Sequence, residues 1–288
     1  MRDLSHGHDH LLSINTATVR KQASLDRIIE ACAAQGVRKI SPWRDQVHPV
    51  GLDRIARQIR DAGVTLSGYC RGGFFTATDA AGLQAALDDN RRAIDEAKTL
   101  GSPCVVLVAG SLPGALEGRP RSKDITLARS QVSDGIAATL EYARSVGMPL
   151  AIEPLHPMQA AERACVNTLE QALDVCDALD PGRSGMLGVA VDAYHVWWDP
   201  KLESQIARAG RERLLAFHVC DWLTPTRDLL NDRGMMGDGI IDLRGLRARV
   251  EAAGYQGPIE VEIFSEAWWQ QPIDAVIRIV IERFRSVV

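Results

Sequence analysis

The chain has 288 residues, of which 46% are hydrophobic and 24% charged, so it can bury a large core in one large domain or two small ones. Its formal net charge of −4 gives no electrostatic reason to expect nucleic acid or an anionic membrane as a partner. No apolar stretch approaches the ~20 residues of a bilayer-spanning helix, and the polar start MRDLSHGHDH lacks the apolar segment of a signal peptide. The six cysteines form no C-x-x-C pair, which is typical of a reduced, cytoplasmic protein.

Short apolar runs, rich in Val, Ile and Leu and bounded by Gly, Pro or polar residues, recur along the chain. Such runs are typical of strands buried on both faces of a sheet. They occupy residues 11–17, 37–41, 64–70, 104–110, 149–154, 186–192, 214–220 and 258–264.

Each run is followed by a segment with helical periodicity. The predicted helices occupy residues 24–36, 51–63, 81–101, 126–147, 167–180, 202–210, 243–254 and 274–288. Five of them end in a glycine suited to the left-handed conformation that closes a helix, after Gln35, Ala62, Leu100, Val146 and Ala253. Ser24 and Asn167 stand where N-caps are expected.

This alternation fits a single (β/α)8 barrel of the TIM type over residues 1–288. A doubly wound open sheet is the alternative, but it needs a phosphate-binding glycine fingerprint after the first strand, and INTATVRKQ has none. We expect residues 1–10, with the histidine-rich HGHDH, to form a polar N-terminal extension. Residues 222–242 are rich in glycine near their end, which favours an active-site flap.

The C-terminal ends of the strands carry the catalytic groups in a barrel of this kind. Here strands five to eight end in four polar residues: Glu153, Asp192, His218 and Glu262. On each strand the bulky apolar residues lie on the face opposite to the polar group. A lone carboxylate at a strand end is more often a surface residue, but the shared alternation indicates that the four side chains converge on the barrel axis.

Three converging carboxylates repel one another unless a cation neutralises them, which favours one divalent metal ion bound by these four residues. Mostly oxygen ligands with one nitrogen suit Mn²⁺ or Mg²⁺ best, and Co²⁺ or Zn²⁺ is compatible. Four protein ligands leave room in an octahedral shell for substrate oxygens. Glu260 shares a face with Glu262 one layer deeper, and we interpret it as a structural, paired or protonated group rather than a second catalytic candidate.

The strand ends IEP (Glu153), VDAYH (Asp192 and His195), FHVCD (His218) and GPIEVEIF (Glu262) resemble those of the sugar phosphate isomerase/epimerase superfamily, with its xylose-isomerase-like TIM barrel. Ketose 3-epimerases, hydroxypyruvate isomerase and inosose dehydratase belong to this superfamily. The resemblance covers essentially the whole chain and implies that Glu153, Asp192, His218 and Glu262 bind the metal. It also implies that Glu153 and Glu262 are catalytic, transferring a proton next to a metal-polarised carbonyl through a cis-enediolate.

Three of the four expected ligands are followed, three residues later, by another polar residue: His156, His195 and Asp221. These residues are candidates for substrate binding, and the alternative is that they only support the ligands through hydrogen bonds. His195 matches a substrate- or metal-proximal histidine of the superfamily. The stretch RGMMGDG resembles a loop in which an arginine lies over the active site, so Arg233 is a further candidate substrate contact.

All six tryptophans lie just past the end of a predicted strand: Trp43, Trp197, Trp198, Trp222, Trp268 and Trp269. Indole faces at the mouth of the barrel suit stacking on the C–H surface of a sugar. Packing or an interface between subunits is the alternative for at least half of them.

We therefore expect an isomerase or epimerase of a small carbohydrate or keto-polyol. The alternative is a metal-dependent lyase or dehydratase, in which the same enolate expels a β-substituent. A non-catalytic sugar-binding barrel is less favoured, because binding alone does not need a glutamate on each face. We expect no nucleic-acid or membrane partner, and a homo-oligomer is compatible with the sequence.

Two departures limit the resemblance. Gln159 stands where the epimerases carry a second glutamate, which leaves the metal site intact but weakens the epimerase assignment. Gly234 stands where an endonuclease-like zinc site needs a histidine, which argues against DNA repair. Few basic residues are expected near the mouth, which favours an unphosphorylated substrate.

Overall fold

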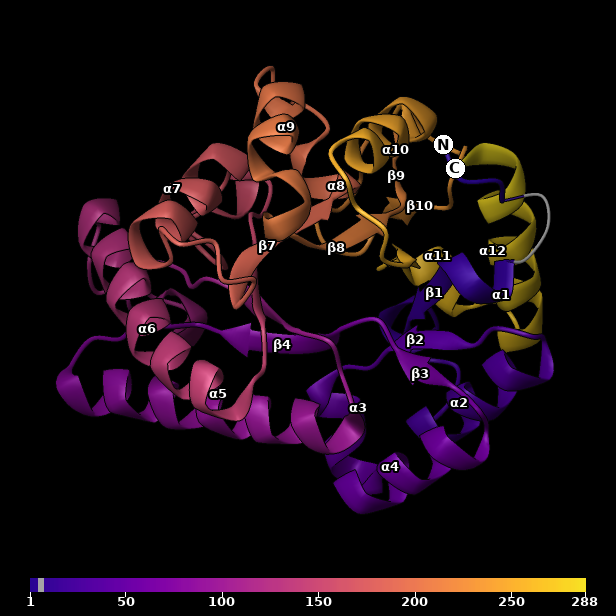
Figure 1. The fold of residues 1–288 in the computed structure, drawn as a ribbon, viewed down its shortest axis with the longest axis horizontal. Coiled ribbons are helices and arrows are strands. Elements are labelled where there is room, and N and C mark those ends of the chain that lie inside the picture. The colour runs from indigo at the N-terminus through magenta and orange to yellow at the C-terminus, as the bar shows by residue number, and fades with distance from the viewer. Residues whose placement is uncertain (5–7) are drawn as a thin grey trace.

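The strands form one sheet that curves into a barrel, with the helices around it (Figure 1). The computed structural model describes residues 1–4 and 8–288. The barrel strands are β1 Leu12–Asn15, β2 Lys39–Ser41, β3 Thr65–Leu66, β4 Tyr69–Gly73, β5 Val105–Val108, β6 Leu150–Glu153, β7 Leu187–Asp192, β8 Leu214–Val219 and β11 Ile259–Val261. Their order is β3-β2-β1-β11-β8-β7-β6-β5-β4, and all neighbouring pairs are parallel. The predicted (β/α)8 barrel is confirmed.

The third predicted strand is divided into two short strands that close the barrel. β3 pairs with β2, whereas β4 pairs with β5, so this segment joins the two edges of the sheet. Backbone hydrogen bonds span the division: Ser67 N donates to Ile40 O at 3.0 Å, and Cys70 N donates to Pro42 O at 3.0 Å. We predicted one strand here because the apolar run is continuous in sequence. Such a run does not reveal that its first part pairs with β2 and its second part with β5.

All eight predicted helices are present. They are α2 Leu25–Ala34, α4 Leu52–Asp61, α5 Ala80–Leu100, α6 Ile125–Val146, α7 Leu169–Leu179, α9 Leu202–Arg213, α10 Leu243–Ala252 and α12 Ile273–Val287. Short helices were not predicted: α1 His8–Leu11, α3 Arg44–Val50, α8 Ala193–Val196, α11 Glu266–Trp269 and the 3₁₀ turns Thr16–Val19, Ala115–Glu117 and Pro157–Gln159. Several of these follow the C-terminal end of a strand and form the rim around the candidate site.

The ends of the helices test the capping predictions. Gly101 and Gly147 adopt the left-handed conformation and close α5 and α6, as expected. Ser24 precedes α2, but its hydroxyl donates to the Asp26 side chain rather than capping the helix backbone. The Asn167 prediction is wrong: Thr168 caps α7, and the Asn167 amide instead donates to two backbone carbonyls of the preceding loop.

Small side chains fill the interior of the barrel and large ones fill the layer between strands and helices. The inner cluster consists of Cys70, Cys104, Val106, Ala151, Ala190 and Ala216. Because this narrow layer admits only small apolar groups, the polar residues of the same faces gather at the ends of the strands. This arrangement places the polar cluster above small apolar side chains, with Glu260 and Ser67 buried beside them.

Residues 222–242 follow β8 and fold back over the strand ends. β9 Asp221–Trp222 and β10 Arg233–Gly234 pair antiparallel there, and Met235 and Met236 are buried. A Cβ atom at Gly239 would lie 2.2 Å from the carbonyl oxygen of Trp222, so only glycine permits this close approach. The flap assignment remains a prediction.

The two ends of the chain lie close together beside α10 and α12 (Figure 1). Arg2 binds the Glu251 carboxylate through its backbone N at 2.8 Å and its Nε at 3.0 Å, and Leu4 is buried. Residues 5–7 of the expected extension, with His6 of its histidine cluster, lie outside the described residues. Within the described part, no helix is both long enough and apolar enough to cross a membrane.

Candidate metal centre and active site

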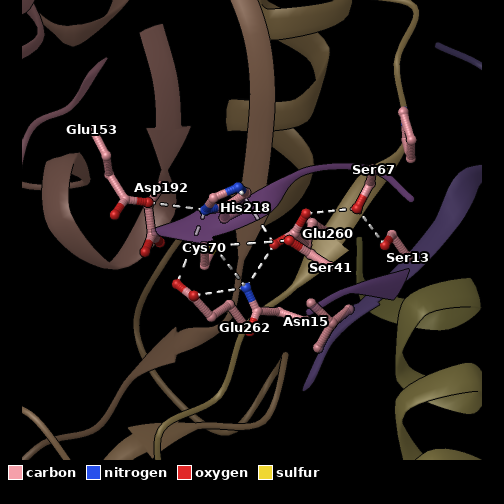
Figure 2. Close-up of polar contacts among 12 residues, drawn as sticks. Ser13, Asn15, Ser41, Ser67, Cys70, Glu153, Asp192, His218, Glu260 and Glu262 are labelled. Atoms are coloured by element: carbon pink, nitrogen blue, oxygen red, sulfur yellow. Dashed lines mark hydrogen bonds and ion pairs between the residues drawn. The ribbon is translucent and has the colours of Figure 1, made fainter. Parts of the chain in front are cut away.

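Four side chains from adjacent strands meet at the C-terminal end of the barrel (Figure 2). Glu153 and Asp192 end β6 and β7, His218 lies on β8, and Glu262 directly follows β11. One ligand atom from each residue lies within 4.8 Å of the others, and all four residues are buried. The convergence expected from the alternation of the strands is therefore confirmed, while the metal-binding role stays a prediction.

The electrostatics of this cluster favour an added cation. Burial raises the pKa of Glu153, and burial raises the pKa of Glu262 to about 8. His218 Nδ1 lies 2.9 Å from Glu153 Oε1 and 3.9 Å from Glu262 Oε2. The carboxylates are therefore costly to ionise together without a positive charge between them.

Arg233 supplies part of that charge. Its Nη1 donates to Asp192 Oδ2 at 2.9 Å and to Glu262 Oε2 at 3.1 Å, and the residue is 4% exposed. Burial opposes ionisation of Asp192, but the positive charge of Arg233 holds its pKa below the ordinary value. Three carboxylates, one guanidinium and one divalent cation would be neutral together, so the residues fit such an ion.

His195 lies between the cluster and the β6 loop. Its Nδ1 accepts a hydrogen bond from His156 N at 3.1 Å, and its Nε2 lies 3.0 Å from Arg233 Nη2. Burial lowers the pKa of His195 to about 3, so the ring is neutral. A neutral imidazole accepts at only one nitrogen, so it cannot accept both hydrogen bonds. The backbone contact is fixed, which makes the contact with Arg233 the one that a substrate can displace.

The structure does not bring His156 and Asp221 into the cavity. The His156 ring packs on Trp222 with centroids 4.8 Å apart, and its backbone orients His195. The Asp221 carboxylate accepts hydrogen bonds from Trp222 N at 2.9 Å, Gly237 N at 2.9 Å and Ile241 N at 3.0 Å. Both residues therefore hold loops in place around the site.

A cavity of about 580 Å³ opens above the cluster. Its wall includes Glu153, Glu262, His195, Arg233 and Gln159, together with the aromatic residues Trp43, Phe74, Phe264 and Trp269. Of the six tryptophans only Trp43 and Trp269 line it in the described part of the chain. Trp197 and Trp222 pack on each other instead, with ring centroids 5.6 Å apart, so the packing interpretation holds for these two.

Sequence reasoning missed Asn15. Its Nδ2 donates to Glu260 Oε1 at 2.7 Å and to Glu262 Oε1 at 2.8 Å, while its Oδ1 accepts from Trp43 Nε1 at 2.7 Å. Asn15 ends β1, so inspection of the first strand end would have found it. Ser67 donates to Glu260 Oε2 at 2.7 Å, which confirms that Glu260 is paired.

The expectation of few basic residues near the mouth is wrong. The cavity is lined by Arg20, Lys21, Arg44, Arg71, Arg163 and Arg233. These residues come from segments that are distant in sequence, so no local pattern of charge reveals that they gather at one rim.

Comparison with curated proteins finds distant relatives over most of the chain. The inosose isomerase of Bacillus velezensis is 22% identical, with 96% of each chain covered. The 3-dehydroshikimate dehydratase of Pseudomonas aeruginosa is 27% identical, over 90% of this chain but only 39% of that protein. The named relatives are thus isomerases and dehydratases.

Solved structures share the fold. A protein of Sinorhizobium meliloti 1021 is 57% identical, with a TM-score of 0.91 over 96% of this chain and 98% of that one. The IOLI protein, crystallised with a bound zinc atom, is 20% identical, with a TM-score of 0.83 over 96% of this chain and 98% of that one. The family model described as the xylose isomerase-like TIM barrel matches residues 20–286, and the chain belongs to this family.

Proposed function

We propose that this protein is a divalent-metal-dependent isomerase or epimerase of a small carbohydrate or keto-polyol. The observation that carries the proposal is the placement of Glu153 and Glu262 at the two ends of the arc formed by β6, β7, β8 and β11. A substrate held between them has a carboxylate on each side, as proton removal and return require. The zinc atom bound by the IOLI protein, which shares this fold, supports a divalent cation in this protein.

Glu153 has the freer carboxylate of the pair. Its Oε1 contacts His218 Nδ1, whereas Oε2 accepts no hydrogen bond from any described residue, and the residue lines the cavity. Both oxygens of Glu262 already accept hydrogen bonds, from Asn15 and Arg233. We therefore assign proton removal to Glu153 and proton return to Glu262, with Asn15 and Arg233 orienting Glu262.

Glu153, Asp192, His218 and Glu262 would hold the metal, with Mn²⁺ or Mg²⁺ favoured. A divalent cation bound there would polarise a substrate carbonyl and acidify the adjacent C–H. Arg233 and His195 line the cavity beside this cluster, and Nε2 of His195 lies 3.7 Å from Asp192 Oδ2. Both side chains are therefore close enough to contact substrate oxygens bound there. We propose that these two side chains bind the substrate oxygens, and that Trp43 and Trp269 exclude water above it.

A dehydratase is the second candidate, favoured by the relatedness to the 3-dehydroshikimate dehydratases. The same enolate expels a β-hydroxyl if a proton donor stands near the leaving oxygen. Isomerisation retains the mass of the substrate, whereas dehydration removes one water.

The test is solvent-deuterium incorporation. Ketohexoses, inososes and 3-dehydroshikimate are incubated in D₂O with the metal-free and the Mn²⁺-loaded protein, and the products are analysed by mass spectrometry. We expect deuterium in at least one compound with Mn²⁺ only, and none with Glu153→Gln at equal metal content. Asp45→Asn, a carboxylate at the mouth outside the cluster, is the matched control. Undiminished exchange in metal-free protein or in Glu153→Gln would refute the proposal.

A further inference from the structure

The cavity wall carries more positive charge than its carboxylates neutralise. Four of its six cations have an acidic partner: Arg20 pairs with Asp45, Lys21 with Glu266, Arg44 with Asp89, and Arg233 with Asp192 and Glu262. The other two, Arg71 and Arg163, have no ion pair and no side-chain hydrogen bond within residues 1–4 and 8–288. Neither arginine therefore has a carboxylate in direct contact, and Asp45 and Asp89 act on Arg71 only at longer range.

The Arg71 side chain packs against an aromatic ring. Its guanidinium carbon lies 3.8 Å from the centroid of the Phe74 ring, which covers one face and leaves the N–H groups to another partner. Burial, followed by the positive charge of Arg163, lowers the pKa of Arg71 to about 10. Two cations that disfavour each other in a partly buried wall indicate a place for an anion.

The pair shares its cavity with the catalytic cluster. Arg71 belongs to β4 and Arg163 to the loop after β6, and both line the cavity together with Glu153 and Glu262. Gln159 lies on the same wall, is 6% exposed, and its side-chain amide has no hydrogen-bond partner in the described chain. This amide is a neutral donor, so it adds no negative charge beside the two guanidinium groups.

The size of the cavity limits the ligand. At about 580 Å³ it lies within the ~300–1,000 Å³ typical of small-molecule sites. The four-residue cluster and the two arginines line this one cavity, so we take a single substrate molecule to contact both. The anionic group is then part of the substrate rather than a separate ion.

We propose that Arg71 and Arg163 bind an oxyanion, a carboxylate or a phosphate, carried by the substrate, so that the protein acts on an acidic keto-polyol rather than a neutral sugar. The proposal rests on the proposed function, because it takes the other end of the substrate to react between Glu153 and Glu262. Guanidinium groups match both oxyanions through paired N–H donors. The substrate class therefore follows from the two arginines.

The experiment measures binding without turnover. The Mn²⁺-loaded protein is titrated calorimetrically with two matched pairs of compounds, quinate against myo-inositol and glucose 6-phosphate against glucose. We expect one acidic compound to bind about tenfold or more tightly than its neutral partner, a difference of about 1.4 kcal/mol. Preference for quinate identifies a carboxylate substrate, and preference for glucose 6-phosphate identifies a phosphate.

Variants separate the arginine pair from general electrostatics. Arg163→Gln should abolish the preference for the acidic compound, and Arg71→Gln should do the same if it folds. Arg57→Gln, an exposed arginine on α4 outside the cavity wall, should keep the preference. Equal binding of acidic and neutral partners, or full preference in Arg163→Gln, overturns the proposal. Deuterium exchange into a neutral ketose would overturn it while leaving the proposed function intact, and absence of all exchange would refute the function alone.

Discussion

Glu260 lies one layer below the proposed metal cluster, on the Nε2 side of the His218 ring (Figure 2). Its Oε1 is 3.6 Å from His218 Nε2, a nitrogen that has no hydrogen-bond partner among the described residues. Asn15 and Ser67 hold the carboxylate in place. Burial alone would lower the pKa of His218, but Glu260 and Glu153 raise it well above its ordinary value. Glu260 thus favours a proton on Nε2, which leaves Nδ1 available as a ligand.

Glu260→Gln keeps the shape of the side chain and removes its charge. We expect metal affinity to fall about 10–100-fold, because outer carboxylates orient a ligating histidine and raise its basicity. Calorimetric titration of the metal-free protein with Mn²⁺ measures the change. Glu266→Gln, at the rim of the cavity and outside the cluster, should leave the affinity unchanged. Equal affinities in both variants would show that Glu260 does not support His218.

At the scale of elements, the loop of residues 222–242 depends on one buried carboxylate. Asp221 is 1% exposed and accepts hydrogen bonds from Trp222, Gly237 and Ile241. These contacts fix both ends of the segment that carries Arg233. Asp221→Ala leaves three backbone N–H groups without their acceptor, at a cost of about 1–3 kcal/mol for an unsatisfied buried group.

We expect Asp221→Ala to increase amide hydrogen exchange in residues 233–241 and to raise KM more than it lowers kcat, because Arg233, a proposed substrate contact, loses its fixed position. Exchange measured by mass spectrometry and steady-state kinetics provide the two readouts. Asp238→Asn is the control. Asp238 lies in the same loop and pairs with Arg283 of α12, and because a partly exposed ion pair contributes little to stability, both readouts should stay as in wild type. Protection that persists in Asp221→Ala would mean that the flap is held by other contacts.

The strands and the loops differ in how far sequence could predict them. Glu153, Asp192, His218 and Glu262 were found because strand geometry alternates and the packed interior admits only small neighbours. The same spacing argument predicted that Asp221 faces the pocket. That prediction failed because a loop has no fixed side-chain period, and the Asp221 carboxylate instead accepts hydrogen bonds from backbone N–H groups. Arg71 and Arg163 could not be paired from sequence, because only the closed barrel brings their segments together.

A second buried charge joins α7, β7 and α9 away from the cavity. Arg213 is fully buried and donates through Nη1 to Asp180 Oδ2 at 2.8 Å and to Leu187 O at 2.7 Å. Burial alone would raise the pKa of Asp180, but Ser184, Arg213 and Arg144 hold it below 3.8. A carboxyl group with a lowered folded-state pKa contributes stability above its unfolded pKa of about 3.9, and this contribution is lost as the pH falls through the folded value.

The expected result is a wild-type unfolding free energy that decreases below about pH 4, with a smaller decrease in Asp180→Asn. Arg213→Met should cost about 3 kcal/mol or more at neutral pH, because Asp180 loses its buried partner. Urea unfolding at several pH values gives both quantities. Arg144→Gln removes the half-exposed partner of the same carboxylate and should cost less. An identical acid dependence in wild type and Asp180→Asn would exclude this pair as its source.

On the scale of the whole molecule, the two kinds of charge site have opposite effects on stability. The Arg213–Asp180 ion pair needs no partner outside the chain, whereas the proposed metal cluster holds three buried carboxylates beside Arg233 and His218. We expect a divalent cation to relieve the repulsion among these carboxylates, in which case its binding stabilises the folded state by RT ln(1 + [M]/Kd). At a metal concentration of about 100 Kd the gain is about 2.7 kcal/mol.

This linkage makes thermal unfolding a test of the metal site that does not depend on knowing the substrate. Mn²⁺ should raise the Tm of the metal-free protein by several degrees, in proportion to the logarithm of its concentration. Glu262→Gln removes one ligand charge, so the metal-free variant should be no less stable than wild type and should gain less from Mn²⁺. Asp45→Asn should keep the full gain. If all three proteins gained equally, the cation would be acting on the surface, and the four converging side chains would be a buried polar network stabilised by Arg233 alone.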